Sequence, residues 1–438
     1  MSDTHAHSVA FVRETMVPES EPPVAERGAI KWIRENLVSS WMNAILTVLS
    51  LLFIWFVLSH VVPWFWHMVW NADSLRECRE IRNEIWGQGT PSACFAVIHE
   101  RWPQLLAGFY PADQYWRPVL ALILFFVALG PVLFSELPRK MLWFSVGYPF
   151  LMYWLMWGGS LWGPIAVAAG FGIGFAAFGL IAAAAGTLAG VIGAIAIPIV
   201  YWLLLAGPIA GALAGAIPIG LEFVPSDDFG GFMLSFIIGI SGIALSLPLG
   251  VLLALGRQSN LFIINKVSIA FIEIIRGVPL IVWLFTASLL LNYFLPPGTN
   301  FDLMLRVIIM VTLFATAYIA EVVRGGLAAL PRGQYEAADA LGLDYWKAQR
   351  LIIMPQALKI AIPGIVNTFI GLFKDTTLVV FIGLLDPIGF ANAIRADTDW
   401  NGIYWELFVF IGLCFFICCF SMSRYSQYLE RKLQTEHR

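Results

Sequence analysis

The segment between two apolar runs, from about Ala320 to about Ile360, holds residues whose types and spacing suggest a specific task. Glu336 is followed by two alanines, and a carboxylate beside small side chains suits close docking against a cationic or hydrogen-bonding partner. The residues of this segment that stand out are Glu336, Ala337, Ala338, Gly342, Ile352 and Pro355. Taken alone, they predict a folded segment that protrudes into the cytoplasm and can contact another surface.

Two short helices joined by a glycine are expected to position these residues. Pro331 breaks the incoming helix, and Gln334–Leu341 is rich in strong helix formers. Gly342 offers the left-handed turn that ends a helix at low cost. Asp344 then caps a second short helix, which Pro355 closes.

The same segment also suits a helical hairpin that rests on lipid headgroups. Trp346, Lys347 and Arg350 are residue types found at the membrane interface. The residue types alone leave this alternative and the docking interpretation equally open.

The composition requires a membrane around the elements that carry this segment. The 438 residues are 59% hydrophobic and 13% charged, with mean hydropathy +0.78, whereas soluble domains are about 45–50% apolar and about 25% charged. Ten spans of about 20 residues would use about 200 residues. A soluble domain, collagen, a disordered chain and a disulfide-framed secreted fold are excluded.

The apolar runs predict an all-α polytopic membrane protein of about ten helices. From Met141 to Leu221 the sequence has no Asp, Glu, Lys or Arg over 81 residues, which is room for three or four spans. The other runs are 41–64, 118–135, 229–255, 278–295, 303–320, one crossing within 361–392, and 403–421.

Orientation follows from the excess of Lys and Arg in short cytoplasmic loops. The loops Glu222–Asp228 and Pro296–Asp302 have no cations, and the long loop 67–117 balances five Arg with six acidic residues. Parity then selects three spans within Met141–Leu221 and places both termini in the cytoplasm. The cations that define the inner face are Arg139, Lys140, Arg257, Lys266, Arg276, Arg332, Lys347, Arg350, Lys359, Arg424, Arg431, Lys432 and Arg438.

Residues 1–40 are polar and carry six acidic residues, unlike a cleavable signal peptide, so the first span is expected to remain as an anchor. The net charge of −3 shows no basic surplus, and nucleic-acid binding is not expected.

The five cysteines form two groups. Cys78 and Cys94 lie in the loop 67–117 and form a candidate disulfide if that loop faces an oxidising compartment; two free thiols are the alternative. The other three lie in the last apolar run, where packing is their default role, and no metal site is expected: Cys414, Cys418 and Cys419.

Glycines recur at helical spacing in the uncharged stretch and favour close helix packing in lipid, with a pore-lining face as the alternative. They are Gly170, Gly174, Gly186, Gly190, Gly207, Gly211 and Gly215.

The word order from Glu336 to Pro355 resembles the EAA signature of ATP-binding-cassette (ABC) importer permeases, with Met354 where that family usually has Leu. The resemblance implies that residues 331–355 form a coupling loop, whose short helix sits in a groove of a separate ATPase subunit and transmits its displacement. Two further stretches resemble permeases for polar amino acids and lie in the right order around this loop: Phe271-Ile-Glu-Ile-Ile-Arg-Gly-Val-Pro-Leu280 and Phe373-Lys-Asp-Thr-Thr-Leu378.

The resemblance to a five-helix type I permease core covers 229–425. The N-terminal half, 41–228, resembles the larger membrane subunit of the general L-amino-acid importers of Gram-negative bacteria, the Aap/Bzt type. This implies a bacterial inner-membrane location, with tails at 1–40 and 426–438. The role of the N-terminal half is left open between stabilising a heterodimer and receiving a binding protein.

The resemblance also implies the partners. They are a second permease subunit in a heterodimer, two copies of an ABC ATPase, and a periplasmic binding protein that delivers an L-amino acid. No Lys follows a Gly, so the phosphate-binding loop is absent from this sequence. ATP and magnesium are therefore expected on the partner ATPase, with no cofactor or catalytic residue on this chain.

The main rival is a secondary, ion-coupled amino acid transporter. Such a protein needs ionisable groups near mid-membrane, and the runs 229–255 and 278–295 carry no charge. The sequence shows no ring-forming filter of the kind expected in a channel. Its six His are scattered, so it also lacks the clustered site that a membrane enzyme would need.

A zwitterionic substrate requires partners for its carboxylate and its ammonium group. The candidates, chosen by position alone, are Thr316, Glu321, Arg324, Lys374 and Thr376. For Arg276 the alternative is a cation reaching the inner interface, and for Lys374 with Asp375 it is a mutual ion pair at a helix break.

Overall fold

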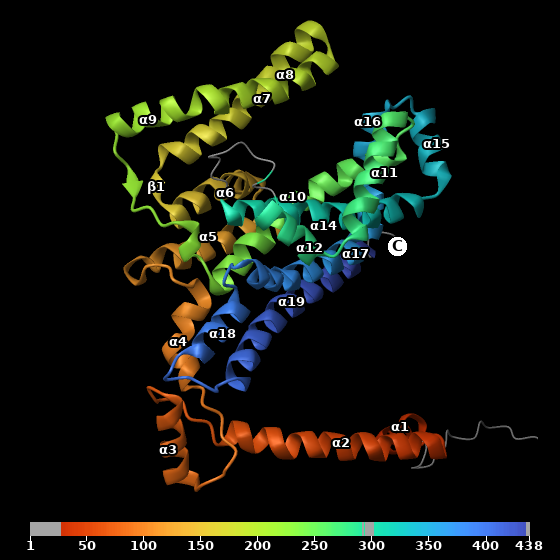
Figure 1. Cartoon of the computed structure of the whole chain (residues 1–438). Helices are drawn as coiled ribbons and strands as arrows, with labels where there is room; N and C mark the ends of the chain where they lie inside the picture. Colours follow the sequence, from red (N-terminus) through yellow and green to blue (C-terminus); the bar gives the residue numbers. More distant parts are fainter. Residues whose placement is uncertain (1–27, 291–292, 294–301, 435–438) are drawn as a thin grey trace, which may run out of the picture. The chain divides into compact units, whose positions relative to one another are not determined.

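The computed structural model describes residues 28–290, 293 and 302–434, and these are almost entirely helical (Figure 1). The chain divides into two compact units. One comprises Met1–Val69 and Glu80–Ala93, and the other comprises Trp70–Arg79 and Cys94–Arg438. The expected tail residues 1–27 and 435–438, and parts of the run 278–295 and of the loop Pro296–Asp302, lie outside the described residues.

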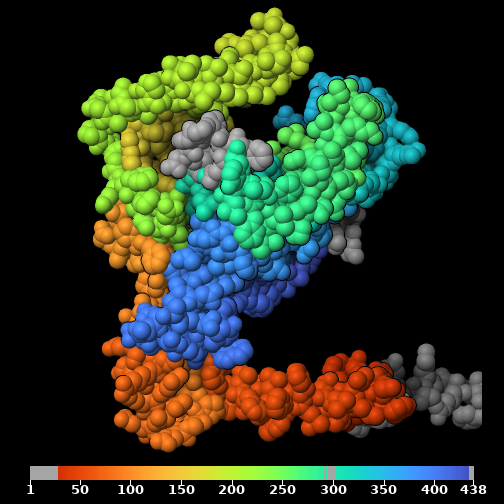
Figure 2. Space-filling view, viewed as in Figure 1, coloured from red at the N-terminus to blue at the C-terminus, as the bar shows by residue number. Residues whose placement is uncertain are grey.

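The smaller unit contains one long apolar helix. Helix α1 (Gly28–Asn36) precedes α2 (Trp41–Trp66), which Ser40 caps by accepting a hydrogen bond from the Asn43 N–H. No residue of α2 is buried, and the face that Figure 2 shows is a continuous row of its side chains. Such a helix is stable only where lipid or another protein surrounds it.

In the larger unit, residues 94–107 contact the last third of the chain. Helix α3 (Leu75–Trp86) begins in this unit, and α4 (Ala96–Ala107) begins two residues after Cys94. Cys94 forms a disulfide with Cys78 of α3, and their Cα atoms lie 6.0 Å apart. The Cys94 N–H donates to Glu406 Oε1 at 3.0 Å, and the Arg101 guanidinium meets Asp397 Oδ2 at 2.7 Å. These contacts join segments about 300 residues apart in the chain.

The uncharged stretch forms a helical hairpin closed by a short strand pair. After η2 (Ala112–Gln114) and α5 (Trp116–Leu133), the turn η3 (Arg139–Met141) leads into α6 (Leu142–Trp157). Strand β1 (Gly159–Ser160) pairs antiparallel with β2 (Gly220–Leu221), in the register Gly159 with Leu221. Between the two strands lie α7 (Trp162–Ala185), α8 (Thr187–Leu204) and α9 (Ala206–Ala216).

The glycines of this hairpin divide into two groups. A Cβ on Gly170 would meet the indole of Trp202, one on Gly174 would meet Pro198, and one on Gly190 would meet Ala182. These glycines let α7 and α8 approach closely, as the packing interpretation predicted. A Cβ on Gly186, Gly207, Gly211 or Gly215 would meet nothing within 4 Å, so packing within the described chain does not account for them.

The last 200 residues form the helical core. After η4 (Ser226–Asp228), α10 (Gly231–Gln258) is followed by α11 (Phe262–Gly277), which the run 278–295 did not include. A bend of 101° separates α11 from α12 (Leu280–Phe285) and the π-helical turn η5 (Thr286–Leu290). The next helix, α14 (Leu303–Ala328), extends two turns past the expected end at Ala320.

The remaining elements are α15 (Arg332–Ala340), α16 (Tyr345–Ala348), the π-helical turn η6 (Gln349–Ile353), α17 (Met354–Asp375), the 3₁₀ turn η7 (Thr376–Ile382), α18 (Pro387–Ala396) and α19 (Trp405–Gln434). Asp386 caps α18 by accepting from the Gly389 N–H at 2.8 Å, and burial raises the pKa of its carboxyl group to about 6.

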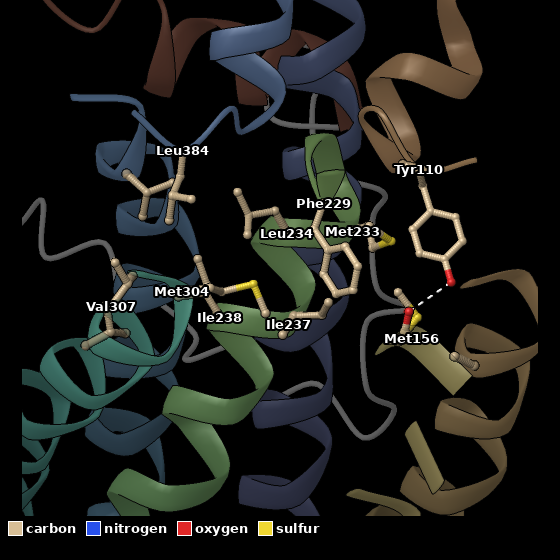
Figure 3. Packing of buried hydrophobic residues seen from close by; sticks show 14 of the residues in the cluster. Tyr110, Met156, Phe229, Met233, Leu234, Ile237, Ile238, Met304, Val307 and Leu384 are labelled. Atoms are coloured by element: carbon tan, nitrogen blue, oxygen red, sulfur yellow. Dashed lines mark hydrogen bonds between the residues drawn. The ribbon is translucent and has the colours of Figure 1, made fainter. Parts of the chain in front are cut away.

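Aliphatic and sulfur-containing side chains fill the centre of the core (Figure 3). Leu234 and Ile238 of α10 pack with Met304 and Val307 of α14, and all four are at most 1% exposed. At the edge of this cluster the Tyr110 hydroxyl donates to the Met156 carbonyl at 2.9 Å. The hydroxyl therefore has a partner where water is excluded.

Eight helices of the described chain are long and apolar enough to cross a membrane, and the bent pair α11 and α12 makes a ninth. Helix α6 is equally apolar but has 16 residues, slightly below the usual length of a span. Within Met141–Leu221, α7 and α8 are among the helices long enough to cross, while α6 and α9 are shorter, so the three crossings expected there stay a prediction.

The Cys78–Cys94 bond yields the first testable prediction. Replacing Cys78 with Ser should lower the free energy of unfolding by about 3 kcal/mol, because the bond closes a loop of 16 residues in the unfolded chain. Thermal unfolding of the purified chain in detergent measures the effect, with Cys414→Ser as the control. Equal melting temperatures for the two variants would show that the bond contributes nothing to stability.

Candidate functional site

The predicted coupling segment folds as two helices around a left-handed glycine. Gly342 has φ +66° and its N–H donates to the Asp339 carbonyl at 2.9 Å, which closes α15 as expected. Asp344 then caps α16, accepting from the Lys347 N–H at 3.0 Å while the Lys347 ammonium lies 2.9 Å from the same carboxylate. The hydrogen bond from the Lys347 side chain is the main cause of the lowered pKa of Asp344.

One face of α15 packs inward. Ala338 is 1% exposed, Tyr335 packs against the cluster around Ile353, and the Gln356 amide donates to Gln334 Oε1 at 2.9 Å. Ala338 was expected to admit close approach of a partner, but it is buried against its own chain. Its small side chain instead brings α15 close to the turn η6, which fixes the helix in place.

The opposite face of α15 is open. Glu336 and Ala337 are exposed, and Figure 2 shows α15 at the surface of the molecule. Three apolar side chains beside them are exposed by more than half: Leu341 at 72%, Tyr345 at 53% and Trp346 at 65%. Exposed aromatic side chains are enriched at the centre of protein interfaces, whereas carboxylates such as that of Glu336 are more common at the polar rim.

Pro355 does not close the second helix. Helix α16 continues through η6 into α17, and Pro355 lies in the first turn of α17. The prediction was wrong because a wider π turn precedes the proline. The lack of a proline N–H costs little in a first helical turn. Ile352, which precedes Pro355 in the motif, packs half-buried against the core cluster.

The base of this segment is held by close contact between α14 and α17. A Cβ on Gly326 would meet the Ala357 carbonyl oxygen, and one on Gly364 would lie 2.7 Å from a methyl group of Val322. Ile319, Val323 and Ile353 are fully buried in the same cluster. Displacement of α15 must therefore act on two packed membrane helices.

An ionic network at the same end of the core connects three helices. Glu321 Oε1 of α14 lies 2.7 Å from Arg257 of α10, and Glu321 Oε2 lies 3.1 Å from Arg324 and 3.7 Å from Arg276 of α11. Arg257 also reaches Glu273 at 3.0 Å. The Glu321 side chain is 15% exposed, so these contacts are partly shielded from water.

This network gives the contacts of three residues singled out in the sequence. Arg276 lies 3.7 Å from Glu321 and stacks over Tyr318, 5.3 Å from the ring centre, and a cation that reaches the interface stays an alternative for it. Glu321 and Arg324 were expected on a substrate path, and in the structure these two side chains form an ion pair with each other. The roles of Arg257 and Glu273 were missed; opposite charges at the ends of consecutive apolar runs are the signal that points to them.

The other path candidates differ in exposure. The Thr316 hydroxyl donates to the Thr312 carbonyl and the Thr376 hydroxyl to the Phe373 carbonyl, and both residues are buried. The Lys374 side chain is exposed where α17 meets η7. Among the described residues, Lys374 and Asp375 do not form the ion pair that was the alternative, although the lysine charge lies near that carboxyl group.

No group of three or more His, Cys, Asp or Glu within the described ranges could hold a metal ion.

Comparison with known proteins defines the class. Residues 246–435 match the family described as "Binding-protein-dependent transport system inner membrane component". The glutamate/glutamine/aspartate/asparagine transport system permease protein BztC of Rhodobacter capsulatus is 58% identical over all of both chains. The inner membrane amino-acid ABC transporter permease protein YhdY of Escherichia coli K12 is 39% identical over 93% of this chain and 94% of that relative.

A shorter relative aligns with about half of the chain. The probable glutamine ABC transporter permease protein GlnP of Bacillus subtilis is 30% identical over 46% of this chain and 90% of its own length.

The fold and these matches define a multi-pass inner-membrane permease of a binding-protein-dependent importer. Within that class, this chain belongs to the amino-acid permease family of ABC transporters. It is a transport component, and in this family the ATPase is a separate subunit. Nothing found supports the rival secondary transporter.

The ionic network yields a second prediction. Glu321→Gln should lower the free energy of unfolding by about 1–3 kcal/mol, because three arginines lose a partly buried partner. Glu273→Gln is the matched control and should cost less than about 1 kcal/mol, since its side chain is 57% exposed. Thermal unfolding in detergent measures both; an equal or smaller shift for Glu321→Gln would contradict the assignment of Glu321 as the centre of the network.

Proposed function

We propose that this permease carries polar L-amino acids, with glutamate, glutamine, aspartate and asparagine as its principal substrates. The supporting observation is the 58% identity over full length to a relative whose name specifies these four. All four share the amino and carboxyl groups and a short polar side chain. A path that binds the shared groups and admits a short polar side chain that is neutral or negatively charged would accept the four together and exclude a cationic side chain.

The transport machine we propose contains this chain and a second permease subunit as a heterodimer. Two copies of an ABC ATPase hold ATP and magnesium, and a periplasmic binding protein delivers the amino acid. Both termini of the chain are cytoplasmic, with tails at 1–40 and 426–438, an N-terminal membrane region at 41–228 and a permease core at 229–425. The excess of cations on one side of the helices supports this orientation.

Residues 331–355 are proposed as the contact with the ATPase. The supporting observation is the open face of Glu336 and Ala337 on a helix whose other face is packed onto α17. Glu336 would pair with a donor on the ATPase, while Ala338 and Ile352 would hold the helix from beneath. Gly342 and Pro355 would maintain the turn between α15 and α17.

For the substrate path, Lys374 is the strongest candidate because its side chain is exposed at a break between α17 and η7. A lysine there would attract the carboxylate of an amino acid. Thr316, Glu321, Arg324 and Thr376 would contribute only in a conformation that releases their present partners.

Uptake by the reconstituted complex tests this function. Labelled glutamate should enter proteoliposomes when ATP is supplied on the ATPase side, and it should continue to enter after an uncoupler collapses the proton gradient. Unlabelled glutamine, aspartate and asparagine should compete, whereas lysine should not, because its cationic side chain is unlike the other four. Uptake driven by an ion gradient without ATP would overturn the proposal, and competition by lysine alone would overturn the substrate class.

A further inference from the structure

Helix α1 has its apolar and charged residues on opposite faces. At 100° per residue, Ala29, Ile30, Trp32 and Ile33 fall in one arc, and Lys31, Arg34 and Glu35 fall in the other. No residue of α1 is buried, and Ile30 and Trp32 are 53% and 58% exposed. The apolar face therefore has no partner within the described chain.

The neighbouring span shows where this helix lies relative to the membrane. Helix α2 has 26 residues, about 39 Å at 1.5 Å per residue, whereas the hydrocarbon core is about 30 Å thick. Its far end carries the aromatic cluster Trp64, Phe65 and Trp66, which is typical of a membrane interface. Counting about 20 residues back from that cluster places the opposite edge of the hydrocarbon near Thr47.

A hydrogen bond places the end of α1 at the same level. The Thr47 hydroxyl donates to the Leu37 carbonyl at 2.7 Å, which holds the residue after α1 against the second turn of α2. Leu37 also closes α1, since its N–H donates to the Ile33 carbonyl at 2.8 Å. The C-terminal end of α1 therefore lies beside α2 at the depth where headgroups meet hydrocarbon.

We propose that α1 is a membrane-surface anchor, with the face of Ala29, Ile30, Trp32 and Ile33 inserted among the lipids of the leaflet where α2 begins. Lys31 and Arg34 then face the phosphate groups, to which their charge is complementary. The anchor fixes the depth of a span that has no buried residue of its own. None of the residues of this surface is among those proposed for the transport path or for the ATPase contact, so the inference stands independently of the proposed function.

Spin labels on the full chain in phospholipid vesicles test this. Cys414, Cys418 and Cys419 are first replaced with Ser, and the Cys78–Cys94 bond is retained. Single cysteines at Ile33 and Arg34 are then labelled, and collision rates with oxygen, which concentrates in lipid, and with a water-soluble nickel chelate are measured. The measurement does not depend on which side of the vesicle the N-terminus occupies.

The label at Ile33 should have an oxygen-to-nickel collision ratio several-fold above that at Arg34 and below that of a reference label at Leu52, which lies deeper, in the middle of α2. Ile30→Glu should lower the ratio at Ile33 to that at Arg34, without loss of the chain from the membrane, because α1 has no buried residue. Equal nickel access at Ile33 and Arg34 in the parent chain would show that α1 lies in water. Protection of Ile33 from both reagents would show that a protein covers it, and either result overturns the proposal.

Discussion

The contact between α14 and α17 is the constraint on which the exposed segment depends. Glycines at 326 and 364 let the two helices pack without a gap, and the buried side chains around Ile353 continue this contact to the base of α15. A helix can transmit force only if its base cannot deform separately. Because Tyr335 of α15 packs against that cluster and Gln356 of α17 donates a hydrogen bond to Gln334 of α15, movement of the open face of α15 is movement of the membrane core.

Charge is used sparingly and at the ends of helices. The network around Glu321 joins α10, α11 and α14 at the end from which α15 emerges, where three arginines surround one largely shielded carboxylate. An unpaired charge at this depth would be costly. At the other end, the Cys94 N–H and Arg101 contact carboxylates that follow α18. Both ends of the core are thus tied by specific polar contacts, while its centre is apolar.

The sequence predicted what depends on local chemistry. The left-handed turn at Gly342 and the cap by Asp344 follow from residue type, and both are present. Helix continuation through Pro355 was missed because it depends on a wider turn that tertiary packing stabilises. The partners of Glu321 were missed for a similar reason, since three helices must come together before these charges meet. Burial of Ala338 is likewise a property of packing.

The central claim is that the open face of α15 is covered by the ATPase, and thiol protection tests it most directly. A cysteine at Ala337, in a chain without the three free thiols, is treated with a water-soluble maleimide in detergent, with and without the ATPase subunits. Gln88→Cys, at an exposed position that follows α3, serves as the control for access. The account predicts that the ATPase blocks labelling at 337 and leaves labelling at 88 unchanged; equal labelling at 337 in the assembled complex would contradict it.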